Sequence, residues 1–155
     1  MDYRKEYEKW LASPALSEDE RAELKALEGN DKEIKARFYG PLEFGTAGLR
    51  GTMYTGLHNM NRHVIRWATQ GFANVIRAEG TEAMQKGIAV CMDCRNHSAE
   101  FARETACVMA ANGIHVRLFE SLRPTPELSF AVREYGCQAG VNVTASHNPK
   151  EHNGY

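Results

Sequence analysis

A serine and a histidine stand side by side near the end of the sequence, at Ser146 and His147. They follow an apolar run, residues 139–143, that predicts a buried strand. The turn signals Asn148-Pro149 and Asn153-Gly154 come next, so we expect Ser146 on a loop just past a strand end. Because ligands of open α/β sheets bind at the carboxyl ends of strands, this loop is the first candidate site.

The chemistry of this serine depends on its neighbours, since a hydroxyl is a weak nucleophile unless a base or a pre-aimed acceptor helps it. Adjacency does not make Ser146 and His147 such a pair, because neighbours in a strand-like segment point to opposite sides. The sequence has no Gly-x-Ser-x-Gly turn, which disfavours a hydrolase. Cations are close in sequence or through the expected fold: His147, Lys150, His152, Arg50 and Arg95. These cations favour phosphoryl transfer, because positioned positive charge does most of the work in that reaction. Another kind of α/β enzyme and a binding or structural domain are the alternatives.

A glycine-rich stretch, residues 40–53, is the second candidate. Four glycines in twelve residues, from Gly40 to Gly51, indicate a backbone that turns tightly or approaches a ligand closely. Exposed N–H groups in such segments bind anions, and Arg50 adds a fork of donors suited to phosphate. The alternative is a glycine-rich lead-in to a strand, with Arg50 solvated.

Composition limits the function classes. A length of 155 residues indicates one domain with a real core. Lys and Arg number 19 against 20 Asp and Glu, and this balance argues against a nucleic-acid partner. No apolar run approaches the roughly 18 residues that cross a membrane, and the polar N-terminus has no signal-peptide core. We therefore expect a cytoplasmic protein with no membrane partner.

The cysteines favour reduced thiols, because the sequence shows no export signal. Cys91 and Cys94 have the Cys-x-x-Cys spacing of a redox pair or of half a zinc site. A zinc site needs two more ligands and only His97 is close. We therefore favour buried thiols at a strand end over metal or redox chemistry.

Three short helices are expected in residues 1–40, over residues 2–12, 17–27 and 30–38. Ser17 with Glu20 forms a capping-box pattern, and Asn30 is a typical N-cap for the third helix. The apolar stripes are narrow, so these helices predict an N-terminal extension and not a core.

From residue 41 on, helices and strands alternate. Asn61 opens a long helix whose expected buried face is Val64, Ile65, Trp67, Ala68, Phe72, Val75 and Ile76. Strands are expected over 87–92, 114–119 and 139–143, with helices opened by Ser98 and by Thr125-Pro126 between them. This order predicts an α/β fold of three layers, α/β/α, with a mixed, mainly parallel sheet. Right-handed crossovers make these three strands parallel, so the loops with Arg95, Arg123 and Ser146 share one edge.

Thr144-Ala145-Ser146-His147-Asn148-Pro149, with Asn153-Gly154-Tyr155 after it, resembles the phosphoserine loop of the α-D-phosphohexomutases, the family of phosphoglucomutase and phosphomannomutase. Residues 44–51, Phe-Gly-Thr-Ala-Gly-Leu-Arg-Gly, are similar to the N-terminal signature of that family, and residues 93–95 to its Asp-x-Arg strand end. The first helices and residues 52–61 resemble the longer bacterial phosphoglucomutases and phosphopentomutase-like relatives. The expected domains are a helical extension, residues 1–40, and the first family domain, residues 41–155.

The resemblance implies an intramolecular phosphate shift between a sugar 1-phosphate and a sugar 6-phosphate. Ser146 would carry the phosphate, with a sugar 1,6-bisphosphate as intermediate and activator. The implied catalytic residues are Ser146, His147 and Arg50, and the implied phosphate contacts are Arg50, Thr144 and Asn148. A Mg²⁺ ion, which prefers hard oxygen ligands, would bind an oxygen of the Ser146 phosphate. We expect Lys150, His152 and Arg123 to be surface charges, and Arg95 to be either a brace of the loop or a substrate contact.

The sequence stops just after the phosphoserine loop. The metal-binding aspartates, the sugar-specificity loop and the distal phosphate-binding domain of the family are absent, as is a lysine expected after Tyr155. We therefore expect a truncated first domain without turnover alone, binding a hexose phosphate and exposing a surface that could drive oligomers. Its last loop, with no returning element, should be mobile. The alternatives are a non-catalytic phosphosugar-binding domain or an interaction module, and the choice among glucose, mannose and pentose phosphates depends on the absent parts.

Overall fold

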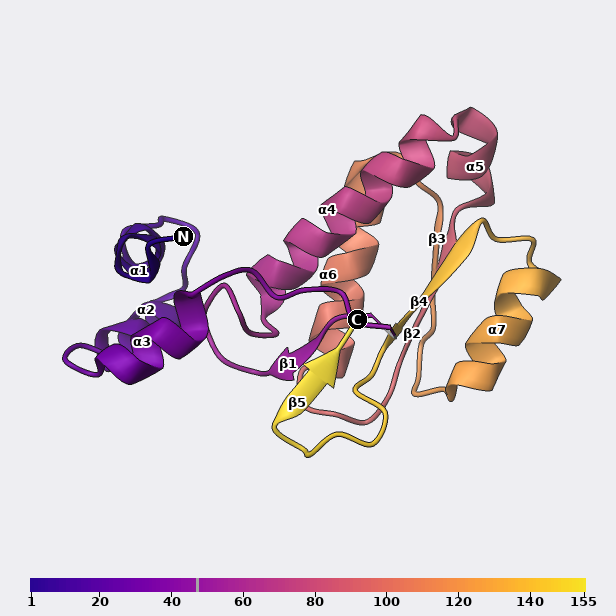
Figure 1. Ribbon diagram of the computed structural model, residues 1–155. Helices are drawn as coiled ribbons and strands as arrows, with labels where there is room; N and C mark the ends of the chain where they lie inside the picture. The colour runs from indigo at the N-terminus through magenta and orange to yellow at the C-terminus, as the bar shows by residue number, and fades with distance from the viewer. Residues whose placement is uncertain (47) are drawn as a thin grey trace.

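A computed structural model describes residues 1–46 and 48–155 (Figure 1). Ala47, part of the glycine-rich stretch, lies outside the described residues. Three helices at the N-terminus lie beside an α/β unit that the rest of the chain forms (Figure 1).

The N-terminal helices form where the sequence predicts them: α1 (Tyr3–Leu11), α2 (Glu18–Lys25) and α3 (Asp31–Phe38). Ser17 and Glu20 make the predicted capping box, and the Asn30 side chain caps α3. The three helices enclose a small core of their own: Leu16, Leu24, Leu27, Ile34, Phe38 and, from the next segment, Leu57. They are therefore a packed unit, although each helix buries little by itself.

The rest of the chain alternates helices and strands: β1 (Arg50–Thr52), α4 (Arg62–Ala78), α5 (Thr81–Lys86), β2 (Ile88–Met92), α6 (Ser98–Ala111), β3 (Val116–Leu118), α7 (Thr125–Glu134), β4 (Ala139–Val143) and β5 (His152–Gly154). The strands β3, β2 and β4 form a parallel sheet in that order. Helices α4 and α6 cover one face and α7 the other, which confirms the three-layer fold (Figure 1). The antiparallel part is a separate two-stranded sheet, β1 with β5. None of the described helices is long and apolar enough to span a membrane.

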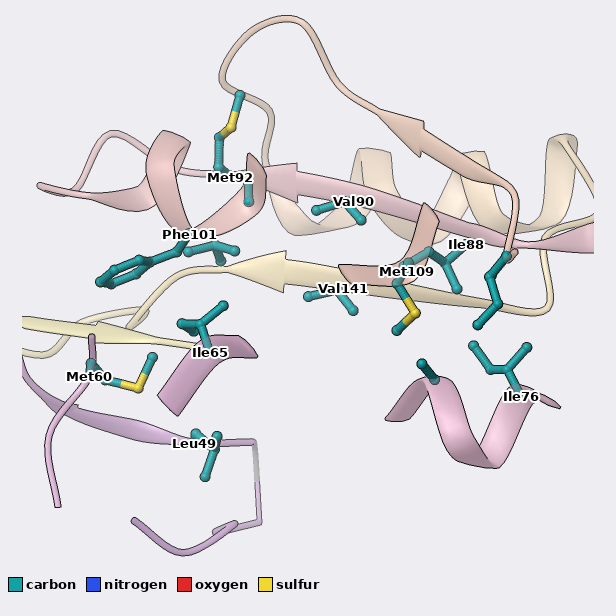
Figure 2. Close-up of a cluster of buried hydrophobic side chains, with 14 of the residues drawn as sticks. Leu49, Met60, Ile65, Ile76, Ile88, Val90, Met92, Phe101, Met109 and Val141 are labelled. Carbon is teal, nitrogen blue, oxygen red and sulfur yellow. The ribbon is translucent and has the colours of Figure 1, made fainter. Parts of the chain in front are cut away.

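The main core lies between the sheet and the layer of α4 and α6 (Figure 2). Strands β2 and β4 contribute Ile88, Val90, Met92 and Val141 to it, and helices α4 and α6 contribute Ile65, Ile76, Phe101 and Met109. All five residues of β2 are buried, as expected for a central parallel strand with a helix layer on each face. The loop that follows β2 is thus attached to the central and fully buried strand of the sheet.

The buried face of α4 differs from the prediction. Trp67 and Val75 are 59% and 56% exposed, while the helix buries Val64, Ile65, Thr69, Ala73 and Ile76. Trp67 lies two residues after Ile65, which is about 200° around the helix axis at 3.6 residues per turn. The prediction is wrong for Trp67 because this side chain and Ile65 point to nearly opposite sides of the helix.

Three other predictions of helix and loop ends need correction. Ser98 is the first residue of α6 and not its cap, since His97 holds the N-cap position and the Ser98 hydroxyl donates to Asp93 over 2.8 Å. Helix α7 begins at Thr125 itself. The last loop does have a returning element, because β5 pairs with β1, so the expectation of an untethered end is wrong.

Candidate functional site

The serine loop, residues 144–151, leaves the carboxyl end of β4 and leads into β5. Strands β2 and β4 end together, because Met92 and Val143 are partners in the sheet register. The Asp93 N–H donates to the Val143 carbonyl over 3.1 Å, and the Arg123 N–H donates to the Met92 carbonyl over 3.2 Å. The loops after β2, β3 and β4 therefore share one edge, as predicted.

Ser146 is exposed and has a left-handed backbone, with φ of 54°. Its Oγ lies 3.3 Å from Nδ1 of His147, within hydrogen-bond reach. The expectation that these neighbours point to opposite sides is wrong, because the left-handed turn at Ser146 breaks the strand-like alternation on which it rested. The two side chains form a hydroxyl–imidazole pair on the surface of the loop.

Arg50 reaches this loop through β1. Its strand pairs with β5, with Arg50 opposite Gly154, and its Nη1 donates to Oδ1 of Asn148 over 3.3 Å. Gly154 has no room for a side chain, because a Cβ there would lie 2.4 Å from the Thr144 carbonyl oxygen. The structure thus brings the glycine-rich stretch and the serine loop together, although 98 residues separate Arg50 from Asn148.

Thr144 has its hydroxyl in two structural hydrogen bonds. The hydroxyl donates to Oδ2 of Asp93 over 2.6 Å and accepts from the Ser146 N–H over 3.0 Å. Oδ1 of Asp93 accepts in addition from the Ser98 hydroxyl and from the Arg95 N–H, over 2.8 and 3.0 Å. Asp93 is therefore a hub of the loop edge, a role that the Asp-x-Arg pattern does not by itself reveal.

Arg95 was expected either to brace the serine loop or to contact substrate, and in the structure it braces the loop. Its guanidinium donates to four backbone carbonyls, those of Ser146, Asn148, Pro149 and His152, over 2.7 to 3.0 Å. Arg123 instead pairs with Glu127 over 2.8 Å and with the Ser121 hydroxyl, within its own loop and helix. Lys150 is an exposed charge, whereas Nδ1 of His152 is buried and has no hydrogen-bond partner among the described residues.

Two residues near the site escape sequence reasoning. Asn153 is fully buried, and its amide donates to the Asn96 carbonyl and to the Ser98 hydroxyl, each over 2.9 Å. Tyr155 accepts a hydrogen bond from Thr69 over 3.1 Å, and burial raises the pKa of its phenol to about 12. Both attach the segment after the serine loop to the α/β unit. Only their place in the Asn-Gly-Tyr triplet hints at them.

A groove of about 1110 Å³ opens beside the serine loop. Arg50, Thr144 and Ser146 are among its polar lining residues, while Trp67, Phe72, Val75 and Leu128 are among the apolar ones. It runs along β4, which has no strand neighbour on its outer side in the described sheet. The candidate site is therefore a polar patch at the border of a large apolar surface.

The Cys-x-x-Cys pair does not form a site of its own. Cys91 is buried and burial raises the pKa of its thiol to about 11, whereas Cys94 is exposed on the loop, contrary to the expectation that both are buried. Within residues 1–46 and 48–155, no three His, Cys, Asp or Glu side chains gather closely enough to hold a metal.

The fold and the loop define a class: an α/β/α domain that presents a serine hydroxyl and an arginine in one groove at the carboxyl edge of its sheet. The model of the family described as phosphoglucomutase/phosphomannomutase, alpha/beta/alpha domain I, matches residues 41–155. The chain belongs to this phosphoglucomutase/phosphomannomutase family. The relatives that it resembles are named as phosphomutases.

Individual relatives agree with the family. The chain is 42% identical over 134 residues to a phosphopentomutase of Homo sapiens, covering 83% of this chain and 22% of the relative. It is 40% identical over 124 residues to a phosphoglucomutase of Staphylococcus saprophyticus, covering 80% and 22%. A crystal structure of a candidate phosphomannomutase from Thermus thermophilus superposes with a TM-score of 0.66 at 31% identity, covering 74% of this chain and 25% of that one. The chain thus spans between a fifth and a quarter of the length of these relatives.

Proposed function

We propose that the chain carries the phosphoserine of an intramolecular phosphotransferase, an isomerase that interconverts a sugar 1-phosphate and a sugar 6-phosphate. The observation that carries the proposal is the exposed Ser146 hydroxyl, next to His147 and in one groove with Arg50, in a chain of this family. Relatives named for pentose, glucose and mannose phosphates support a phosphosugar as the substrate class. Glucose phosphate is the first sugar to test.

The proposed reaction has two transfers. Phosphorylated Ser146 gives its phosphoryl group to a free hydroxyl of the sugar monophosphate, so the bond from phosphorus to Oγ breaks and one to the sugar oxygen forms. The proton of that sugar hydroxyl ends on Oγ. The bisphosphate then reorients, and Oγ takes the other phosphoryl group, so the bond from that phosphorus to its sugar oxygen breaks. The proton of Oγ passes to the freed sugar oxygen, which leaves the isomeric monophosphate.

Residues of this chain have distinct parts in these transfers. Nδ1 of His147, 3.3 Å from Oγ, holds or receives the proton that Oγ gives up. Arg50, whose guanidinium makes one 3.3 Å bond to Asn148, has further donors for the phosphoryl oxygens. Thr144 lines the same groove, and Asn148 is bonded to Arg50 at its border. Thr144 would contact phosphate in addition to its hydrogen bonds with Asp93 and Ser146.

We also propose that Mg²⁺ binds an oxygen of the Ser146 phosphate. The described part of the chain supplies no metal-holding cluster, so the remaining ligands come from outside it, and no step is assigned to the ion. Turnover and the choice of sugar depend in the same way on protein outside this chain, which covers about a fifth of the curated relatives cited above. The isolated chain should accept phosphate without turning over. A cytoplasmic location is part of the proposal, supported by four free cysteines.

The test is phosphorylation of Ser146 by a hexose 1,6-bisphosphate with Mg²⁺, followed by intact mass and peptide mapping. We expect a gain of about 80 Da on the peptide that contains Ser146, from one added phosphate. The Ser146→Ala variant should gain nothing, and Arg50→Ala should react at least about tenfold more slowly, since a lost charge-assisted contact costs about 1.5 kcal/mol or more. Equal labelling of wild type and Ser146→Ala contradicts the proposal. Unchanged binding of glucose 6-phosphate by both, with no labelling, favours a binding domain.

A further inference from the structure

The left-handed backbone of Ser146 needs an explanation in its surroundings. A φ of 54° is disfavoured for a residue with a Cβ, and such a conformation persists only where neighbouring groups hold it. Both peptide groups of Ser146 are in fact held, the N–H on one side and the carbonyl on the other. The groups that hold them come from the loop after β2 and not from the serine loop alone.

The N–H of Ser146 is fixed through a relay. The N–H donates to the Thr144 hydroxyl over 3.0 Å, and this hydroxyl donates to the Asp93 carboxylate over 2.6 Å. Since the Thr144 hydrogen is used on Asp93, its oxygen must face the Ser146 N–H as an acceptor. The carboxylate thereby sets the direction of a bond that it does not itself make.

The carbonyl of Ser146 is fixed by Arg95. Nη2 donates to the carbonyls of Ser146 and Asn148, and Nη1 donates to those of Pro149 and His152. Nε lies 3.4 Å from Asp93, and the Arg95 side chain is only 13% exposed. A guanidinium has five N–H groups, so four on carbonyls and one toward Asp93 leave none for a phosphate oxygen.

We propose that Asp93 and Arg95 act as positioning residues that hold Ser146 in its left-handed conformation before any phosphate is present. We call this pair the Asp93–Arg95 clip. It aims the hydroxyl at His147 and into the groove without touching a substrate. The conformational part stands by itself, while its consequence for phosphate acceptance depends on the function proposed above.

The first test is amide NMR and hydrogen exchange of the folded 155-residue chain. In Arg95→Lys, one ammonium cannot span four carbonyls, so the amide signals of residues 144–152 should shift and the Ser146 amide should exchange at least about tenfold faster. Sheet amides such as those of Val90 and Val141 should keep their protection. Arg123→Lys is the matched control, at the same sheet edge but bonded elsewhere, and its serine loop should match wild type. A wild-type serine loop in Arg95→Lys overturns the proposal.

A second pair of variants decides the case if Arg95→Lys also loses sheet protection. Thr144→Val keeps the shape but removes the hydroxyl relay, and Thr144→Ser restores it. The clip predicts fast exchange of the Ser146 amide in Thr144→Val and wild-type protection in Thr144→Ser. Equal protection in both variants would show that the relay holds nothing.

Phosphorylation by a hexose 1,6-bisphosphate separates this inference from the proposed function. If wild type accepts phosphate, Arg95→Lys should do so at least about tenfold more slowly, with the concentration that gives half the maximal rate unchanged within about twofold. A changed half-maximal concentration with an unchanged rate would make Arg95 a substrate contact and overturn the clip. If wild type accepts none, the proposed function fails for this chain, while the exchange measurements still decide the clip.

Discussion

At the scale of single residues, the candidate site depends on a glycine, Gly154, whose surroundings leave no room for a side chain. Gly154 lies opposite Arg50, and a Cβ there would come within 2.4 Å of the Thr144 carbonyl and 2.8 Å of the Leu49 carbonyl. Both neighbours are backbone atoms, so neither can turn aside as a flexible side chain would. Glycine at this position is what lets β5 lie against both β1 and the start of the serine loop.

This crowding gives the first stability prediction. Gly154→Ala should lower the free energy of unfolding by about 1 to 3 kcal/mol, the usual cost of forcing atoms into filled space. Gly71→Ala is the matched control, because Gly71 lies in α4 with nothing within 4 Å of the added Cβ. That substitution should raise the free energy of unfolding by about 0.5 to 1 kcal/mol. Urea unfolding at neutral pH measures both, and equal effects would contradict the close approach.

Most side chains of the site could be identified from the sequence, but the groups to which they are hydrogen-bonded could not. Ser146, His147, Arg50 and Asn148 do lie together. The conformation of Ser146 could not be predicted, because a left-handed serine is imposed by Arg95 and by Thr144 acting with Asp93, and no local pattern encodes those bonds. The local sequence determines which reactive groups the site contains, and hydrogen bonds from distant parts of the chain determine how these groups are oriented.

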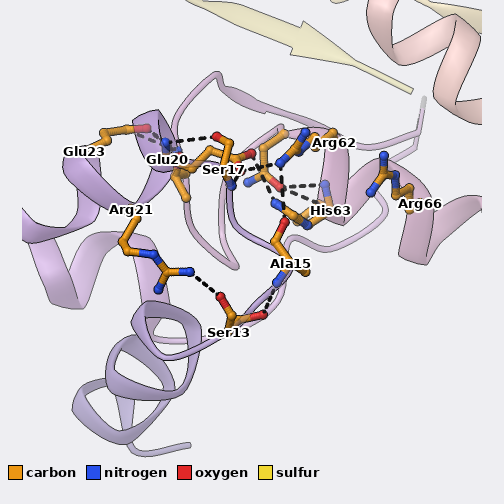
Figure 3. A network of polar contacts seen from close by, with 12 residues as sticks. Ser13, Ala15, Ser17, Glu20, Arg21, Glu23, Arg62, His63 and Arg66 are labelled. Atoms are coloured by element: carbon orange, nitrogen blue, oxygen red, sulfur yellow. Dashed lines mark hydrogen bonds and ion pairs between the residues drawn. The ribbon is translucent and has the colours of Figure 1, made fainter.

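At the scale of elements, Glu20 joins the helical extension to α4 (Figure 3). Its carboxylate accepts from the Ser17 N–H over 2.7 Å within α2. It also accepts from Arg62 over 2.6 Å and meets Nε2 of His63 over 3.1 Å, both in the first turn of α4. The Trp10 ring packs edge-on against His63, with centroids 5.6 Å apart. A single carboxylate thus caps one helix and binds the start of another.

This junction should depend on pH. Burial raises the pKa of Glu20, but hydrogen bonds from the Ser17 N–H, Arg62 and His63 outweigh burial and hold the pKa below its ordinary value of 4.5. Because the folded state lowers this pKa, the stabilisation is complete above about pH 5 and is lost as the pH falls through the folded pKa. The residue is partly exposed, so the contribution is about 1 kcal/mol or less.

The corresponding measurement is urea unfolding of Glu20→Gln and wild type at about pH 7 and about pH 3.5, on either side of the ordinary glutamate pKa. Glutamine keeps the capping box and removes the charge, so the variant should be less stable at neutral pH by about 0.5 to 1 kcal/mol. The difference should shrink toward zero at the acidic pH. Asp19→Asn, on the exposed side of the same helix, serves as control for a general loss of negative charge. A difference that is constant with pH would show that Glu20 acts through shape alone.

Elements with strong local signals were predictable, and those made by distant pairing were not. The caps Ser17, Asn30 and Asn61 and the strand β4 are all where the sequence places them. The strand β5 has only three residues, His152-Asn153-Gly154, and the last two are of types typical of a turn. It is extended because β1 pairs with it, and no pattern within its own sequence carries that information.

At the scale of the whole molecule, an apolar groove lies next to the polar site. Trp67 and Val75 of α4 line it and are more than half exposed. An apolar dye such as anilinonaphthalene sulfonate should therefore bind the native chain and brighten. Val75→Glu should weaken that binding at least about threefold, because it puts a charge into the apolar wall. Phe130→Glu, on an exposed position of α7 outside the groove lining, should leave it unchanged. Equal loss in both variants would point to unspecific dye binding.

The pairing of β1 with β5 sets the order in which the molecule can assemble. Arg50 and Asn148 are 98 residues apart, so their contact closes nearly the longest loop that the chain contains. Closing this loop costs conformational entropy before the contact stabilises the chain, so such non-local pairings are intrinsically slow to form. During synthesis, the helical extension and the β2–α6–β3 unit can fold while β1 is still unpaired. We therefore expect the serine loop and the arginine to meet only after the segments between them have folded, because their contact closes a loop of 98 residues.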